Sequence, residues 1–86
     1  MATVEERVKA ATAKVLGVPV EGIKNEHDFA VDLGAESVQS VELVAMFEEE
    51  FGIEMDEESA LSVETVGKAV EYITKICKEQ DVEVEQ

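Results

Sequence analysis

Apolar residues at helical spacing, three and four positions apart in three separate stretches, constrain the fold of this 86-residue chain more than any other feature. In the last stretch they share one helix face, and Thr65 before them is a suitable N-cap residue. The residues of this face are Val66, Ala69, Val70, Ile73, Ile76 and Cys77. Apolar and polar residues nowhere alternate over a stretch long enough to predict a β-strand. The sequence therefore predicts an all-α protein.

A first helix is predicted to begin after Thr3, because Thr3 and Glu6 have the spacing of a capping box. Its apolar stripe consists of Val4, Val8, Ala11 and Val15. Gly17 suits a left-handed helix end, and Pro19 shortly beyond it cannot continue a helix. These two residues mark the end of the predicted helix.

A second helix is predicted at about 37–51, with Gly52 as its end, and a short helical turn at 56–61. Residues 18–36 form a long connection between the first two helices. Such a loop is uncommon in so small a domain, so we expect it to be packed and functional. Its apolar anchors are Ile23, Phe29 and Leu33.

Together these elements predict a small antiparallel four-helix bundle, with three long helices, one short helix and a long first loop. We place a single domain at 1–78. Residues 79–86 are acidic and lack a continuing apolar stripe, so we expect them to form a frayed tail.

Charge is distributed unevenly along the chain. Twenty-one Asp and Glu residues against seven Lys and Arg give a net charge of −14. No Lys or Arg lies between Asn25 and Gly67, whereas thirteen acidic residues do. This charge argues against binding to nucleic acid or to an anionic membrane, and it favours basic partners. We expect a docking role for the acidic surface.

Other sequence features narrow the functional class. The single cysteine, Cys77, rules out a disulfide scaffold and a thiolate metal site, and we expect it to be a packed thiol. No apolar run approaches the roughly 18 residues of a membrane-spanning helix. We therefore expect a cytoplasmic, monomeric protein without a metal centre.

The second predicted helix has two apolar faces. One face holds Leu43, Val44, Phe47 and Phe51, which are candidates for the core. The other face holds Val38, Val41 and Ala45, with Glu48 along one flank and Glu42 and Glu49 along the other. This second face is either an exposed docking stripe fringed by carboxylates or a surface covered by the long loop or the short helix.

Ser37 stands at the start of the same helix. It is either an ordinary N-cap serine or the acceptor of a phosphate ester, which free amides and the helix dipole would stabilise there. The only histidine, His27, lies in the loop, and Ser37 has no evident base. If Ser37 reacts, another protein must activate it, which indicates a substrate rather than an enzyme.

The segment Asp32-Leu33-Gly34-Ala35-Glu36-Ser37-Val38 resembles the acyl carrier proteins of dissociated (type II) fatty acid synthesis. The resemblance continues through Val41-Glu42-Leu43, Glu48-Glu49-Glu50-Phe51-Gly52-Ile53 and Thr65-Val66-Gly67, and extends from about Thr3 to Lys78. It implies that Ser37 carries 4′-phosphopantetheine, transferred from coenzyme A by a Mg²⁺-dependent phosphopantetheinyl transferase. The protein would then hold acyl groups as thioesters and would not itself be an enzyme.

The resemblance also implies two further sets of site residues. The acyl chain would lie in the bundle core, which we expect to include Phe29, Leu43, Phe47, Phe51 and Ile73. Fatty acid synthase-type enzymes would dock their basic patches against the second helix. The residues expected at that surface are Asp32, Glu36, Val38, Val41, Glu42, Ala45, Glu48 and Glu49.

Two positions depart from the family's Asp-Ser-Leu signature. Glu36 replaces the aspartate and adds a methylene group, and Val38 replaces the leucine with a shorter, β-branched side chain. These changes lead us to expect a specialised carrier, served by its own transferase or acyl-loading enzyme.

Three other interpretations are open from the sequence. An unmodified acidic docking protein with a basic partner would keep its function after Ser37→Ala. An enzyme would need a mixed acid and base site, for which the sequence offers only carboxylates. Within the carrier family, the cargo could be an aminoacyl or polyketide intermediate in place of a fatty acyl chain.

Overall fold

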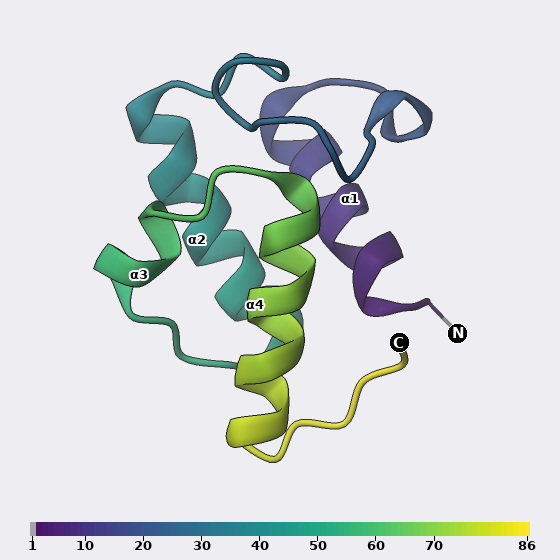
Figure 1. Ribbon diagram of the computed structural model, residues 1–86, viewed down its shortest axis with the longest axis vertical. Helices are drawn as coiled ribbons and strands as arrows, with labels where there is room; N and C mark the ends of the chain where they lie inside the picture. The colour runs from purple at the N-terminus through teal and green to yellow at the C-terminus, as the bar shows by residue number, and fades with distance from the viewer. Residues whose placement is uncertain (1) are drawn as a thin grey trace.

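The computed structural model describes residues 2–86 and shows an all-α domain (Figure 1). Its elements in chain order are α1 Val4–Leu16, the 3₁₀ turn η1 Val20–Gly22, α2 Ser37–Phe51, α3 Glu57–Leu61 and α4 Val66–Glu79. Within residues 2–86, β-type pairing is limited to two isolated bridges, Thr3 with Glu85 and Asp28 with Thr65. The predicted bundle of three long helices and one short helix, with a long first loop, is confirmed.

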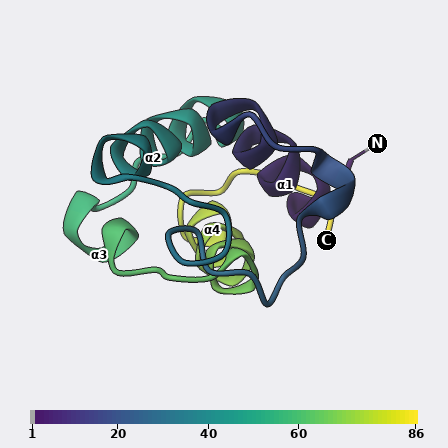
Figure 2. The same ribbon diagram turned by 90° about the horizontal axis from the view of Figure 1, so that it is seen from above.

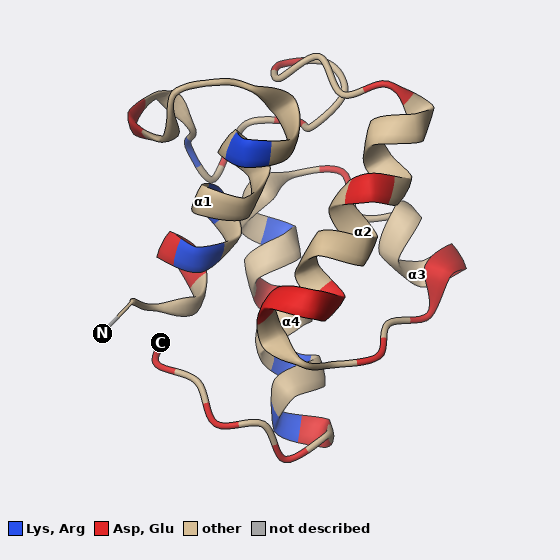
Figure 3. Cartoon of the chain, turned by 180° about the vertical axis from the view of Figure 1, so that it is seen from behind, with Lys and Arg blue, Asp and Glu red and all other residues tan. Residues whose placement is uncertain are grey.

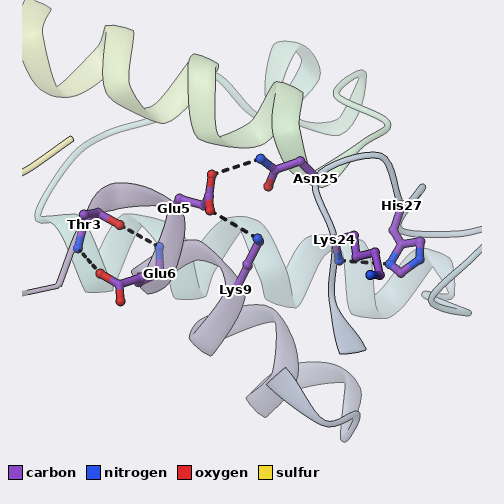
Figure 4. A network of polar contacts seen from close by, with 7 residues as sticks. All are labelled: Thr3, Glu5, Glu6, Lys9, Lys24, Asn25 and His27. Carbon is purple, nitrogen blue, oxygen red and sulfur yellow. Dashed lines mark hydrogen bonds and ion pairs between the residues drawn. The ribbon is translucent and has the colours of Figure 1, made fainter. Parts of the chain in front are cut away.

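Local signals placed most helix starts correctly. In the capping box of α1, the Thr3 amide donates to Glu6 Oε1 at 2.8 Å and the Glu6 amide donates to Thr3 Oγ1 at 3.2 Å (Figure 4). At α4, Thr65 Oγ1 accepts from the Lys68 amide at 3.2 Å. Each contact satisfies an amide that has no partner inside its helix, which explains why the helix begins at that residue.

The three long helices end in the same way. A residue with left-handed dihedrals follows each helix: Gly17 (φ 67°) directly after α1, Gly52 (φ 65°) directly after α2, and Asp81 (φ 61°) two residues after the end of α4. The next amide then reaches back five residues, from Val18 to Ala13, from Ile53 to Glu48 and from Val82 to Cys77. This arrangement satisfies carbonyl groups that the helix leaves free, and glycine adopts it at the least steric cost.

The core lies between α1, α2 and α4, while α3 packs against α2 (Figures 1 and 2). α1 contacts both of the other long helices. The most deeply buried apolar side chains come from α1 and α4, and they are Val4, Val8, Val66, Ile73 and Cys77. The apolar faces predicted for the first and last helices therefore do form the core.

The long first loop is packed, as expected. Asn25 Nδ2 donates to Glu5 at 2.9 Å, and Lys9 Nζ approaches the other oxygen of the same carboxylate at 3.3 Å (Figure 4). On the other side, the Gly67 amide donates to the Asn25 carbonyl at 2.8 Å. The Phe29 amide donates to the Glu64 carbonyl at 2.9 Å. These bonds tie the loop to both α1 and the start of α4.

The last residues return along the molecule towards its N-terminus (Figure 1). The Val4 amide donates to the Glu85 carbonyl at 2.8 Å, and Val82 and Val84 are half-buried against the core. Gln80 exchanges two side-chain hydrogen bonds with the Glu54 backbone, at 2.9 and 2.7 Å. The division of the chain at residue 78 and the fraying of 79–86 stay predictions, but the tail makes contacts that the sequence did not indicate.

Candidate functional site

Ser37 is the first residue of α2, and its side chain is exposed. The N-cap is Glu36, whose dihedrals are extended (φ −86°, ψ 168°) and whose amide donates to Gln39 Oε1 at 3.0 Å. The interpretation of Ser37 as an N-cap is therefore wrong, because the helix begins at Ser37 itself, one residue earlier than a serine cap would require. Among residues 2–86, the Ser37 hydroxyl takes part in no hydrogen bond.

The start of α2 offers a favourable position for an anion. Within residues 2–86, the amides of Ser37 and Val38 have no hydrogen-bond acceptor. α2 is 15 residues long, so the aligned peptide dipoles place partial positive charge at this end. A phosphate ester on Ser37 would meet both the free amides and the dipole.

The segment before Ser37 is held by a compact set of hydrogen bonds. Asp28 Oδ1 accepts from the amides of Ala30 and Val31, each at 2.9 Å. Asp32 Oδ2 accepts from the Asp28 amide at 2.7 Å, and the Ala35 amide closes the loop onto the Phe29 carbonyl at 2.8 Å. The predicted docking carboxylate of Asp32 is thus already used within the loop.

The second apolar face of α2 is open to solvent. Val38 is 65% exposed, Val41 is 48% exposed, and Ala45 is also exposed. Neither the long loop nor α3 covers them, so the alternative of a covered face is wrong. The face is an exposed apolar stripe, and its role in docking stays a prediction.

Acidic residues surround this stripe. Figure 3 shows Asp and Glu along α2 and α3, while Lys and Arg lie on α1, α4 and the first loop. Glu42 and Glu49 are exposed. Glu48 is half-buried, and one of its carboxylate oxygens accepts from the Met55 amide at 2.9 Å. Of the three glutamates predicted to flank the stripe, Glu48 therefore also holds the chain between α2 and α3.

A cavity of about 50 Å³ lies between α2, α3 and α4. Of the five predicted core residues, four line it: Phe29, Leu43, Phe47 and Ile73. Val44 and Ala69, which belong to the apolar faces predicted for the second and last helices, also line it, and its other lining residues are Ser40, Met55, Ala60, Leu61, Val63 and Tyr72. The helical spacing of Ser40, Leu43 and Phe47 was a signal that could have revealed one wall of it.

Phe51 is buried but does not line this cavity. The Arg7 guanidinium lies over the Phe51 ring, 4.4 Å from its centroid, and the Arg7 Nε donates to Glu50 at 2.8 Å. Phe51 therefore belongs to the contact between α1 and α2, one helical turn beyond the end of the cavity.

The sequence of residues 6–73 matches the model of the family described as "phosphopantetheine attachment site". The match covers more than half of the chain. The chain belongs to the phosphopantetheine-attachment family. It is a carrier protein with covalent 4′-phosphopantetheine, and not a catalyst. Carriers of this family are modified by phosphopantetheinyl transferases and serve partner enzymes.

The carrier's structure fits such a group at Ser37. The hydroxyl is exposed and without a hydrogen-bond partner in the part of the chain that the structure describes, and it stands at the start of a long helix. The other candidate nucleophile is unsuitable: Cys77 is fully buried, and burial raises the pKa of its thiol, so little reactive thiolate forms.

Two negative findings apply to residues 2–86 of the carrier. They contain no group of three or more His, Cys, Asp or Glu side chains placed to hold a metal ion. None of the helices in this range has the length and apolar character needed to cross a membrane.

Proposed function

We propose that Ser37 carries the 4′-phosphopantetheine arm, and that this carrier delivers acyl thioesters in type II fatty acid biosynthesis or a related specialised lipid or polyketide pathway. When bound, the arm supplies the thiol that holds the acyl group. The observation that carries the proposal is the exposed Ser37 hydroxyl, which begins α2 and has no hydrogen-bond partner in residues 2–86.

The carrier itself offers Ser37 no base. The only histidine, His27, accepts from the Lys24 amide through Nδ1 at 3.0 Å and so holds the turn in which it lies. The hydroxyl proton must therefore pass to a group of the transferase. The role of α2 is to present the hydroxyl and to stabilise the charge of the resulting ester through its N-terminal amides.

The exposed stripe and its carboxylates would receive the partner enzymes. The stripe is Val38, Val41 and Ala45, and the exposed carboxylates near it are Glu36, Glu42 and Glu49. A fatty acid synthase-type enzyme with a basic patch around an apolar contact complements this surface. We expect the carrier to act as a monomer in the cytoplasm, since the stripe is then free for these enzymes.

The cavity supports an alkyl cargo. Its lining is apolar except for the Ser40 and Tyr72 side chains, so it favours a hydrocarbon chain over an aminoacyl group. The small cavity would have to widen to hold a long chain. Leu61 of α3 lines the cavity and is partly exposed, so the cavity would widen most easily on the side of α3.

The carrier is further proposed to be specialised. Glu36 is both the N-cap of α2 and the residue before the serine, and Val38 is the first residue of the exposed stripe. Changes at both positions alter the surface that a transferase meets. A Glu36→Asp, Val38→Leu double variant should be modified faster than the wild type by a primary-metabolism transferase. Equal rates would contradict the specialisation.

The proposed attachment is tested by intact-protein mass after incubation with coenzyme A, Mg²⁺ and a panel of phosphopantetheinyl transferases. The wild type and Ser40→Ala, a control serine on the same helix, should each gain one phosphopantetheine. Ser37→Ala should gain none. If no transferase modifies the wild type, an unmodified acidic docking protein becomes the better interpretation.

A further inference from the structure

Val31 is an exposed apolar residue that does not belong to the proposed docking surface. It is 82% exposed, more than Val38 or Val41. It lies in the loop that precedes Ser37, between two aspartates that bond to the loop backbone. An apolar residue this exposed gains nothing from burial within the domain, and its apolar area is free for contact with another molecule.

The loop holds Val31 in a fixed orientation. Its own amide donates to Asp28 Oδ1 at 2.9 Å, and the Asp32 amide donates to the Asp28 carbonyl at 3.0 Å. The Gly34 amide donates to the Ala30 carbonyl at 3.1 Å. With the backbone bonded on both sides, Val31 cannot turn inward without breaking several of these hydrogen bonds.

Single exposed apolar residues are common on proteins, but here they are grouped. Five large apolar side chains are exposed within residues 2–86, and among them Val31 precedes Ser37 by six positions while Val38 and Val41 closely follow it. The loop stands at the same end of the molecule as the start of α2 (Figure 1). From the chain length, and with the helix-like bonds up to Gly34, the Val31 and Ser37 Cα atoms are no more than about 15 Å apart.

That separation fits within one interface. A typical interface covers about 800 Å² on each partner, which spans more than 15 Å in any direction. A partner seated over Ser37 would therefore contact Val31 as well as the stripe. Its surface must also carry positive charge, because Asp32, Glu36 and Glu42 lie in a stretch without Lys or Arg.

We propose that Val31 is a recognition residue for the phosphopantetheinyl transferase, which seats it in an apolar recess bordered by basic residues. This inference rests on the proposed attachment at Ser37. The transferase is the partner chosen because it must reach the Ser37 hydroxyl itself. Enzymes that act on the acyl group work at the far end of the arm and need not cover the loop.

The test compares kcat/KM for modification of the wild type, Val31→Asp, Val31→Ile and Val20→Asp, with the transferase that modifies the wild type. Val20 is also exposed, but it lies in η1, away from Ser37 in the chain. Val31→Asp should lower kcat/KM about 5- to 30-fold, mainly through KM, as expected for loss of an interface anchor. Val31→Ile should keep the wild-type value, and so should Val20→Asp.

The choice of aspartate excludes a long-range electrostatic explanation. An added negative charge would speed association with a basic enzyme, so a slower reaction reports the close contact: the lost apolar area and the cost of placing a carboxylate in an apolar recess. Urea unfolding midpoints should agree between wild type and Val31→Asp, because the side chain is exposed. Equal kcat/KM for these two proteins, or an equal loss in Val20→Asp, would overturn the inference. No modification of the wild type would instead overturn the proposed attachment on which it rests.

Discussion

α2 and α4 are nearly equal in length, at 15 and 14 residues, yet they use their apolar residues differently. α4 buries its predicted face almost completely, and α2 buries only Leu43, Phe47 and Phe51. A second apolar face of α2, formed by Val38, Val41 and Ala45, faces solvent and begins beside Ser37. The comparison indicates that α4 holds the domain together, whereas part of α2 is available for contacts with other proteins.

The largest expected effect separates these two roles. Ile73→Ala removes a fully buried side chain of α4 and should lower the free energy of unfolding by about 2–5 kcal/mol. Val41→Ala on the exposed stripe should change it by less than about 0.5 kcal/mol, but should slow modification of Ser37. Urea unfolding and the mass assay measure the two quantities. A large loss of stability in Val41→Ala would break the distinction.

The ends of the same two helices offer a second comparison. Gly52 directly follows α2, and Asp81 lies two residues after the end of α4; both are in the left-handed conformation. Because a Cβ atom is strained there, Asp81→Gly should stabilise the protein by about 0.5–1 kcal/mol. Gly52→Ala should destabilise it by about 1 kcal/mol for the same reason. Thermal unfolding of both variants should show a higher melting temperature for Asp81→Gly and a lower one for Gly52→Ala. A loss of stability in Asp81→Gly would contradict this explanation.

Charge on the two helices should have a smaller effect. Glu49 on α2 lies among other acids, whereas Glu71 on α4 has Lys75 at the favourable i, i+4 spacing. Glu49→Gln should therefore raise the melting temperature at low salt, and Glu71→Gln should not. Salt or millimolar Mg²⁺ should raise the wild-type melting temperature and reduce the gain from Glu49→Gln. A wild-type melting temperature independent of salt would contradict this account.

The smallest expected effect distinguishes the starts of α1 and α2. The Thr3 amide, which donates to Glu6, lowers the pKa of that carboxyl from its ordinary value of 4.5. This contribution to stability is complete above pH 4.5 and is lost as the pH falls through the lower pKa of the folded state. At α2 the equivalent acceptor is the Gln39 amide, which does not titrate in this range.

As the pH falls from about 5 to 3, Glu6→Gln should therefore lose less stability than the wild type does. Urea unfolding midpoints at each pH measure this difference. Gln39→Glu should introduce a similar acid-dependent step at α2, and it serves as the matched variant. Identical pH profiles for wild type and Glu6→Gln would show that the α1 capping box contributes nothing to acid stability.

Local patterns predicted much of this protein. The capping box at Thr3, the N-cap at Thr65 and the buried face of α4 all follow from residues within a few positions of one another. The position of Ser37 at the start of α2 followed from the same kind of signal, although its place as the first helical residue did not. Which of Glu36 and Ser37 becomes the N-cap depends on dihedral angles set by the preceding loop.

The sequence by itself determined the helical class, the approximate helix limits and the acidic surface, because each depends on short-range spacing or on composition. Only the tertiary structure decided which face of α2 stays exposed, that Asp32 bonds within its loop, and that Phe51 packs under Arg7. It also decided that Val31 points outward. These features depend on residues that meet across the fold, and burial is set by what the rest of the chain places against a side chain.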